Sequence, residues 1–541
     1  GTLDARGVHG ADGGDILIHA DRDIDVAPAA VLGFGGHSGG RAALIAERDL
    51  DIGKGSVIDG SARSLKGHGG AAELSGHGRL LLGSMPTLGR GGSLLLDPNT
   101  VFIYGTNASD CGAANLCISA SQVDQSLDNG QETLIVAGNH IQVGSDASIF
   151  SQSNSGLLLG IGQTSAGSTG AFGDGQTFPS SGGLSFIRGA ATGGSGSIDF
   201  LTSLTDGSIA SVGIGGAFEA YSALDKGHVT LGDVTAVGGL TVAAVGNIDA
   251  GNLFVSGGGF ALGSQQVKPS DVVASASLVS DTGTVKAASA SVDALANSYS
   301  YTDGNGYAHD VSRGDASLVM RGTSVAVGDT SNFGGVSVFA QGVASADISA
   351  HAGGSVSIAG TTFADVSGNA TDTATLGGFR STLSSGLASI SLHTDQPTAG
   401  NDTGSIVTGG IEAPGPNASI NLESGTVATD FIYAQAYLSS FTEGPQSQRY
   451  TAKQNGKTIL DSDFGVATLS VIGRGGNATQ PSVDIGGTTT LLGPAVEATV
   501  QAAGDVNFGD SVSITGQGFS ISGSGNTLLA ALQDGSIAQF F

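Results

Sequence analysis

Four aspartates near the start of the chain have a spacing that suits a divalent cation. Asp23 and Asp25 flank one aliphatic residue in the segment DIDV, and Asp49 and Asp51 do the same in DLDI. In an extended strand the two side chains of each pair lie on one face, about 6.5–7 Å apart. Stacking of the two segments in register would place Asp23 beside Asp49 and Asp25 beside Asp51, with strands ~4.8 Å apart.

Carboxylates this close repel one another unless a positive charge compensates them. Ca²⁺, which prefers carboxylate oxygens, would relieve the repulsion, so Asp23, Asp25, Asp49 and Asp51 are the candidate metal ligands. Arg22 and Arg48 offer another solution, a structural ladder of ion pairs, and we favour it over the metal. Catalysis is a third alternative, with a precedent in pectate lyases, which are β-helices that use outward aspartates, Ca²⁺ and a basic arginine. No further motif supports it, and we predict no catalytic residue.

The two cysteines of the chain, Cys111 and Cys117, enclose five residues. That separation allows a local disulfide in an oxidising compartment, which we expect here. Two free thiols, or a bond to another chain, are the alternatives. A catalytic cysteine is not expected, because no basic surroundings are evident in the sequence.

Five histidines (His9, His19, His37, His68 and His77) lie within the first 80 residues. Their spacing matches no zinc motif, and no thiol lies nearby. His37 and His68 follow glycines and are expected in solvated turns. Apart from calcium at the four aspartates, the sequence therefore predicts no cofactor.

The elements that must position these residues are repeats. The segments GGDILIHADRDIDVAP, GGRAALIAERDLDIGK, GGAAELSGHGRLLLGS and GGSLLLDP begin at Gly13, Gly39, Gly69 and Gly91. Each full unit holds two short alternating apolar runs joined by a turn. Repeats of roughly 20–50 residues are typical of stacked architectures, in which no unit buries its apolar face alone. The sequence therefore predicts an all-β chain, a single parallel β-solenoid over residues 1–541.

Insertions interrupt the repeats. Residues 105–130 are predicted to form a loop and one short capped helix, because Ser121, Val123 and Leu127 precede Gly130. We expect an irregular Gly/Ser-rich stretch over 151–183, an irregular patch over 397–415 and a polar loop over 442–457. Binding specificity is expected in such loops if they have a function beyond tolerated length variation.

Composition excludes several classes of protein. The 92 glycines follow no collagen period, and the 39% hydrophobic content argues against disorder. A net charge of −27 would repel nucleic acid and anionic membranes. No apolar run approaches the length of a membrane span. The chain opens in mid-repeat and neither end looks capped, so we expect either a segment of a longer chain or copies that stack head to tail into filaments.

Two segments, one before and one after the cysteine pair, resemble a known protein family. GGSLLLDPNTVFI, from Gly91, and ISASQVDQSLDNGQETLIVAGNHIQVGSDASI, from Ile118, resemble the filamentous haemagglutinin-like exoproteins of two-partner secretion systems over about 50 residues. The resemblance implies a right-handed parallel β-helix that is exported through an outer-membrane transporter to the bacterial surface or medium. The secretion domain of that family is absent, and a cysteine pair is unusual in it.

Together these features predict a secreted or cell-surface structural or adhesive exoprotein, not an enzyme. Expected partners are other copies or neighbouring solenoid segments, and host or bacterial surface glycans and proteins. One alternative is a polysaccharide lyase- or hydrolase-like enzyme on the same fold. Another is a secreted ligand-binding exoprotein, such as a scavenger of metal or of a haem protein.

Overall fold

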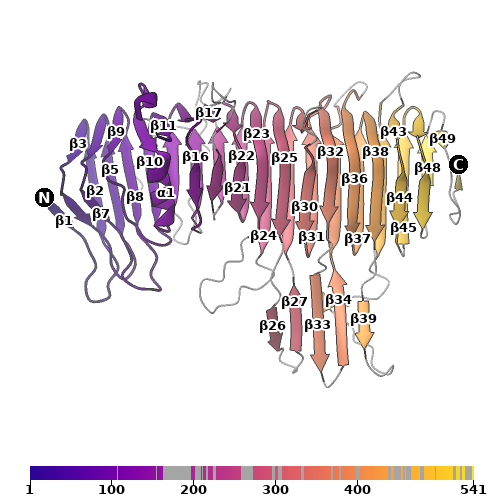
Figure 1. The fold of residues 1–541 in the computed structure, drawn as a ribbon, viewed down its shortest axis with the longest axis horizontal. Coiled ribbons are helices and arrows are strands. Elements are labelled where there is room, and N and C mark those ends of the chain that lie inside the picture. Colours follow the sequence, from indigo (N-terminus) through magenta and orange to yellow (C-terminus); the bar gives the residue numbers. More distant parts are fainter. Residues whose placement is uncertain are drawn as a thin grey trace. The chain divides into compact units, whose positions relative to one another are not determined.

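The structure is a computed structural model that describes most of the 541-residue chain. The described residues are 1–106, 108–153, 155–161, 197–200, 209, 211–214, 217–222, 227–257, 272–294, 299–302, 308–312, 314–329, 334–366, 370–376, 379–397, 402–436, 440–443, 453–454, 457–458, 465–475, 481–493, 495–515, 520–523, 527–529 and 539–540. They belong to two compact units, which we call unit 1 (Gly1–Gly251) and unit 2 (Asn252–Phe541). Long parallel sheets of successive coils make up both units (Figure 1), so the predicted class, a parallel β-solenoid, is confirmed. Its right-handed sense stays a prediction.

The first sheet of unit 1 takes one strand from each successive coil. Each strand pairs in parallel and in register with the strand of the next coil. The strands are β2 (Asp15–Ala20), β5 (Arg41–Ala46), β8 (Ala71–Gly76), β10 (Ser93–Pro98), β13 (Glu132–Ala137), β16 (Leu157–Ile161), β19 (Phe218–Ser222) and β22 (Gly239–Ala244).

A second parallel sheet holds the other strand of each coil, and shorter strands complete the turns. In spatial order it contains β3 (Asp23–Val26), β6 (Asp49–Ile52), β9 (Arg79–Leu82), β12 (Leu116–Ser119), β11 (Thr100–Tyr104), β14 (His140–Val143), β17 (Ser197–Phe200), β20 (Val229–Leu231) and β23 (Ile248–Ser256). The shorter parallel rows are β1 (Thr2–Asp4), β4 (Val31–Gly33) and β7 (Val57–Asp59), and then β15 (Ile149–Ser151), β18 (Val212–Ile214) and β21 (Val234–Val237).

The repeated glycines of the sequence stack into a column in unit 1. A Cβ atom at Gly40 would lie 2.1 Å from the carbonyl oxygen of Gly14, and one at Gly70 would lie 2.7 Å from that of Gly40. At Gly92 the distance to the carbonyl oxygen of Gly70 would again be 2.7 Å. Carbon and oxygen cannot approach so closely. The glycine repeat therefore exists because any side chain at these positions would separate neighbouring coils.

In strands such as β3 and β9, alternation divides the side chains between core and solvent. In β9, Leu80 is fully buried, whereas its neighbour Leu81 remains 37% exposed. Leu80 lies beside Leu50, which lies beside Ile24 of the preceding coil. Such columns of aliphatic side chains form a continuous core inside the coils.

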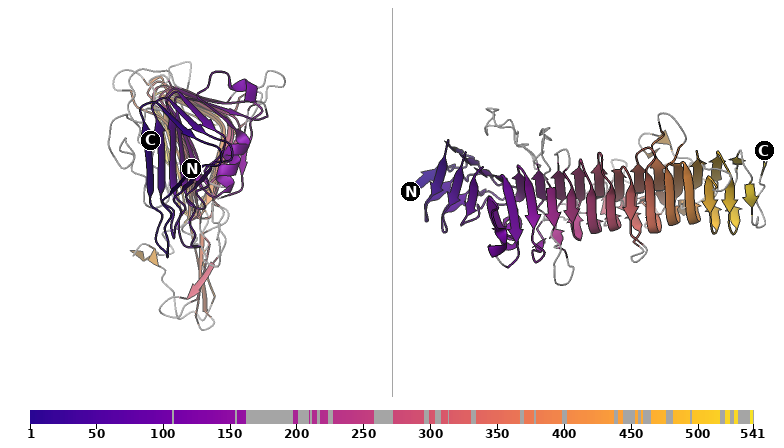
Figure 2. Two further views of the ribbon diagram at one scale, coloured as in Figure 1. Left: turned by 90° about the vertical axis from the view of Figure 1, so that its left-hand side faces the viewer. Right: turned by 90° about the horizontal axis from the view of Figure 1, so that it is seen from above.

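The insertion at 105–130 contributes a strand as well as a loop. A 3-10 turn, η1 (Ala108–Cys111), leads to β12, and β12 lies between β9 and β11 although it follows both in sequence. Helix α1 (Ala120–Asp128) comes next and lies on the outer side of the stack (Figure 2). Its Val123 and Leu127 are buried.

The coils of unit 2 also form two parallel sheets. The first contains β24 (Val273–Ser280), β28 (Asp315–Gly322), β31 (Val343–Ala350), β35 (Leu387–Thr394), β37 (Asn417–Ser424), β42 (Val466–Gly473), β45 (Ala495–Ala502), β48 (Ser520–Gly523) and β50 (Gln539–Phe540). The second contains β25 (Val285–Ala294), β29 (Val325–Val327), β30 (Val336–Ala340), β32 (Ser355–Asp365), β36 (Ser405–Gly415), β38 (Thr426–Ala436), β43 (Val483–Ile485), β44 (Thr489–Leu492), β46 (Val506–Phe508), β47 (Val512–Thr515) and β49 (Thr527–Leu529).

Segments inserted between coils of unit 2 pair with one another in an antiparallel sheet, which the sequence analysis missed. It projects from the coils in Figure 1. Its strands are β26 (Tyr299–Thr302), β27 (Ala308–Ser312), β33 (Ala370–Leu376), β34 (Phe379–Ser385) and β39 (Ser440–Glu443).

The expected irregular stretches have different outcomes. The patch over 397–415 was predicted wrongly in its second part, because β36 occupies Ser405–Gly415 and hydrogen-bonds to the coils on both sides. The stretch over 151–183 contains β16, and residues 162–183 lie outside the described residues. Of the loop over 442–457, the structure describes the end of β39 and part of a hairpin of β40 (Lys453–Gln454) and β41 (Lys457–Thr458).

Leu80 and Leu81 provide a matched test of the core. Leu80→Ala should lower the free energy of unfolding by about 2–5 kcal/mol, because it removes buried methyl groups and leaves a cavity. Leu81→Ala should cost less, roughly 1 kcal/mol, since that side chain is 37% exposed and its removal leaves no closed cavity. Urea unfolding of the full chain, followed by circular dichroism, measures both. Equal losses for the two variants would contradict the assigned inward and outward faces.

Candidate functional site

The four predicted aspartates stack as their spacing implies. Strands β3 and β6 place Asp23 beside Asp49 and Asp25 beside Asp51. Arg48 donates from Nε to Asp23 Oδ1 at 2.7 Å and from a terminal nitrogen to the other carboxylate oxygen. That hydrogen bonding lowers the pKa of Asp23 below its ordinary value.

A second arginine continues the ladder. Arg79 lies beside Asp49 in the register of β6 and β9, and its guanidinium is 3.6 Å from the Asp49 carboxylate. Of the two arginines considered from the sequence, Arg48 makes the ion pair with Asp23. Among the described residues, no three carboxylate, imidazole or thiol groups converge as metal ligands. Calcium at Asp23, Asp25, Asp49 and Asp51 stays a prediction.

Two of the five N-terminal histidines meet on one carboxylate. Glu47 lies between His19 and His77, which come from the coils on either side of it. The His19 Nε2–Glu47 Oε1 and His77 Nδ1–Glu47 Oε2 distances are both 3.3 Å. The hydrogen bond from His19, and then the charge and hydrogen bond of His77, lower the pKa of Glu47. The sequence analysis did not select Glu47, because its partners are 28 and 30 residues away.

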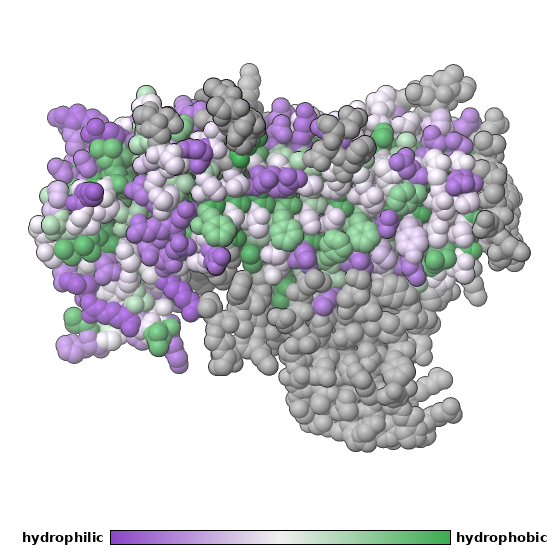
Figure 3. All heavy atoms as spheres, viewed as in Figure 1, coloured by the Kyte–Doolittle hydropathy of each residue, from purple (hydrophilic) through white to green (hydrophobic). Residues whose placement is uncertain are grey.

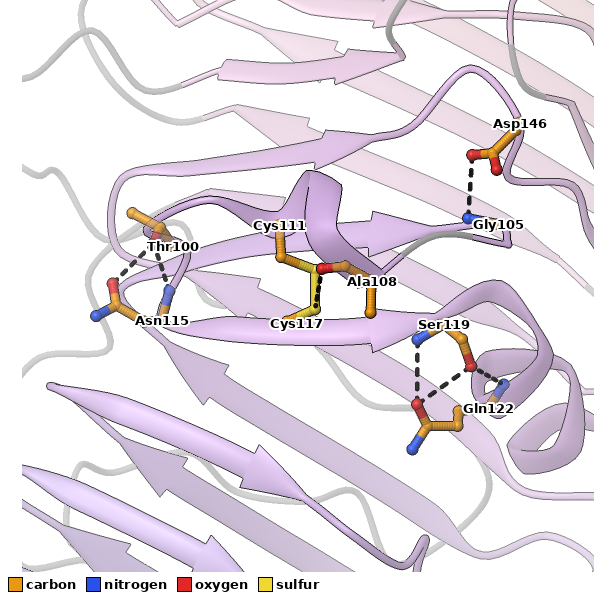
Figure 4. The surroundings of a disulfide bond; sticks show 9 residues. All are labelled: Thr100, Gly105, Ala108, Cys111, Asn115, Cys117, Ser119, Gln122 and Asp146. Atoms are coloured by element: carbon orange, nitrogen blue, oxygen red, sulfur yellow. Dashed lines mark hydrogen bonds between the residues drawn. A yellow bond between two sulfur atoms is a disulfide. The ribbon is translucent and has the colours of Figure 1, made fainter.

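A disulfide bond cross-links the insertion at 105–130. Cys111 and Cys117 form a disulfide, with their Cα atoms 5.7 Å apart, between η1 and β12 (Figure 4). On one side of this bond, the Asn115 backbone N–H donates to Thr100 Oγ1 at 2.9 Å. On the other side, Asp146 accepts the backbone N–H groups of Gly105 and Thr106, at 3.2 and 2.9 Å. These bonds hold both ends of the insertion against the coils.

Helix α1 is fixed by its own cap and by a buried polar network. Ser119 and Gln122 form a capping box, in which each side chain satisfies a backbone N–H of the other residue (Figure 4). Gln131 is fully buried and donates to Ser126 Oγ at 2.7 Å, while its Oε1 accepts the Leu88 N–H at 2.8 Å. A buried network whose members are hydrogen-bonded in this way has a structural role.

A different candidate site lies in unit 2, and the sequence analysis missed it. An open groove of about 470 Å³ crosses four successive coils, on the outer face of β36, β38 and β44 and of the turn that precedes β47. Its lining residues are Glu412, Asp430, Phe431, Ile432, Tyr433, Gly487, Thr488, Thr490 and Asp510. Its volume lies within the ~300–1,000 Å³ that is usual for small-molecule sites.

Strand register assembles the groove from distant parts of the sequence. Glu412 lies beside Tyr433, and Tyr433 lies beside Thr490 of the following coil. A Cβ atom at Gly410 would lie 2.2 Å from the Phe431 ring, so that glycine leaves the space in which the ring rests. The groove therefore has a fixed aromatic floor beside its carboxylates.

The groove is acidic. It contains the carboxylates of Glu412, Asp430 and Asp510, and none of its nine lining residues, all of them described, is Lys, Arg or His. Burial, and then the negative charge of Glu412, raise the pKa of Tyr433, so its phenol stays protonated and donates to Gln435 Oε1. Thr488 Oγ1 donates to Asp510 at 3.4 Å. Chemically, the groove offers hydrogen-bond acceptors and aromatic faces to a cationic or hydroxyl-rich ligand.

Comparison with known proteins adds no family to this picture. No protein-family model matches the chain, and no curated protein matches it significantly. The likeness to filamentous haemagglutinin-like exoproteins thus stays a prediction. In the part of the chain that the structure describes, no helix has the length and apolar character needed to cross a membrane.

The Asp23–Arg48 pair predicts a pH-dependent contribution to stability. Arg48 depresses the folded-state pKa of Asp23, so the contribution is present above the ordinary value of 3.8 and is lost as the pH falls through the lowered pKa. Asp23→Asn should therefore lower the melting temperature at pH 7, and its difference from wild type should shrink below pH 3.8. The control is Asp25→Asn, on the same face of β3. Equal, pH-independent losses in the two variants would count against the ion pair.

Loss of the disulfide should open the insertion locally. In the chain-entropy model, a loop as short as this one contributes about 2 kcal/mol. The double variant Cys111→Ser, Cys117→Ser should therefore exchange backbone amides of residues 105–119 faster by roughly one to two orders of magnitude. Hydrogen-exchange mass spectrometry measures this, with peptides from β2 and β5 as the internal control. Unchanged exchange in 105–119 would show that the hydrogen bonds alone hold the segment.

Proposed function

We propose that the chain is a segment of a secreted or cell-surface β-solenoid exoprotein with a structural and adhesive function. The observation that carries this proposal is the in-register stacking of outward side chains, of which Asp23 beside Asp49 is one example. Outward side chains of successive coils therefore form rows with a spacing of ~4.8 Å, which gives an extended surface for extended partners.

The disulfide in the insertion at 105–130 supports the proposal that the protein is exported. A Cys111–Cys117 disulfide persists in oxidising surroundings and is rare in the reducing cytosol. Export through an outer-membrane transporter to the bacterial surface is the route that the family resemblance implies. Surface glycans and proteins are the partners that fit an adhesive role, together with other copies or neighbouring solenoid segments. The net charge of −27 argues against nucleic acid.

The enzyme alternative has less support. In the ladder of unit 1, the Arg48 guanidinium and the Asp23 carboxylate bind each other, so neither is oriented toward a substrate. An exposed ion pair of this kind fits the structural role of a solenoid face.

Adhesion under flow tests the proposal. Beads coated with the full chain should be retained on at least one surface coated with a neutral, acidic or amino-sugar polysaccharide, and albumin-coated beads should not. The same preparation should release no reducing sugar from those polysaccharides. Failure of retention on every surface would contradict the adhesive function, and depolymerisation would establish the enzyme alternative instead.

A further inference from the structure

The charges of the unit 2 groove contrast with other carboxylates of the same unit. Asp402, whose side chain is almost fully buried, binds Arg474 Nε at 2.6 Å and also accepts the Gly404 N–H. The same guanidinium binds Glu423. Those carboxylates therefore have a cationic partner within the fold. The groove carboxylates have no cationic side chain among the groove residues that face them.

Uncompensated negative charge favours a cationic ligand. Glu412 and Asp430 line the open volume from neighbouring coils, and Asp510 lines it from two coils further along the stack. An ammonium group there would form charge-assisted hydrogen bonds, which are stronger than neutral ones. The overall charge of −27 adds a long-range attraction for cations.

Two aromatic rings in the groove provide a second kind of contact for a ligand. Phe431 and Tyr433 line the groove, and the faces of such rings attract ammonium groups and stack against the apolar face of a pyranose. The combination of a ring with a carboxylate matches an amino sugar, which carries an apolar face and an ammonium group on the same residue.

The same surface continues beyond the groove along the direction of stacking. Phe363 lies beside Glu412 in the register of β32 and β36, and its ring centroid is 5.3 Å from that of Phe339. Figure 3 shows hydrophobic side chains among hydrophilic ones on the face of the strands labelled β32, β36 and β38 in Figure 1. Because coils repeat at ~4.8 Å, close to the length of one pyranose, this arrangement suits a polymer better than a single sugar.

We infer that the groove formed by Glu412, Asp430, Phe431, Tyr433 and Asp510 binds a polysaccharide that contains amino sugars with free ammonium groups. The inference rests on the adhesive function proposed above and gives that function a ligand class. Glu412 and Asp430 bind the ammonium and hydroxyl groups, and the two rings stack against the sugar.

Calorimetric titration of the full chain at pH 6 tests this inference with three probes: a β-1,4-linked glucosamine hexamer, its fully N-acetylated counterpart, and free glucosamine. The glucosamine hexamer should bind most tightly, and its affinity should fall as salt is added. Glu412→Gln should weaken binding about tenfold, the effect expected for one hydrogen bond to a charged group. Tyr433→Ala should weaken it as well.

Two control variants separate the groove from general charge and general hydrophobicity. Glu497→Gln removes one exposed carboxylate from β45, in the other sheet of unit 2, and Phe150→Ala removes an exposed ring from β15 in unit 1. Both should bind the hexamer as wild type does, and melting curves check that every variant folds.

Three results would overturn the inference. Equal affinity for the N-acetylated hexamer would show that the ammonium group is not recognised. Equal weakening by Glu497→Gln would show that net charge alone attracts the probe. No binding of either hexamer would exclude the site. If beads coated with Glu412→Gln adhere as wild-type beads do, the adhesive function stands without this groove, whereas failure of the wild-type beads removes both.

Discussion

Parallel hydrogen bonding between coils, at one strand spacing, is the constraint on which the rest of this structure depends. It places each residue directly beside one residue of the next coil, so side chains on either face of a strand line up in columns. Inside the coils this repetition is favourable, because columns such as Ile24, Leu50 and Leu80 form a continuous core. At the turns it requires glycine, because a side chain at Gly40 or Gly70 would meet the carbonyl below.

Outside the coils, the same repetition brings like charges together and forces a compensating arrangement. Asp23 and Asp49 stand side by side, and the arginines that follow at Arg48 and Arg79 reach back to them. Each exposed pair adds little to stability on its own. The stagger nevertheless lets two aspartates occupy neighbouring strands without a metal ion. In the motif that most resembled a cation site in the sequence, two of the four aspartates, Asp23 and Asp49, therefore have arginine partners.

Much of the fold could be predicted from the sequence because its signals are local. The spacing of the glycine pairs indicated the class, and the run from Ser121 to Gly130 indicated the helix, which the structure places at Ala120–Asp128 with Ser119 as its N-cap. Long-range pairings could not be predicted in this way. Nothing in Leu116–Ser119 indicates that this strand enters the sheet before β11, and nothing local indicates that separate insertions pair into one antiparallel sheet.

The groove was missed for a related reason. Its residues extend from Glu412 to Asp510, and variable coil lengths conceal which of them share a face. The segment before Gly415 also has the glycine, threonine and proline content of a turn. In the structure, Gly410 serves instead to let the Phe431 ring lie against the strand. Composition thus indicated an irregular segment where the backbone is a strand paired on both sides, with one register shift against β32 and one position cleared for a ring.

Compensation of charge distinguishes structural carboxylates from candidate functional ones in this fold. A solenoid can neutralise an acid with an arginine from a nearby coil, as Arg48 of the next coil does for Asp23 and Arg474, two coils away and in a more buried setting, does for Asp402. Glu412, Asp430 and Asp510 converge on one groove whose lining holds no such arginine. A bound cation would be attracted to the negative charge of all three. The cationic ligand inferred above would supply at this groove the positive charge that Arg48 and Arg474 supply elsewhere in the fold.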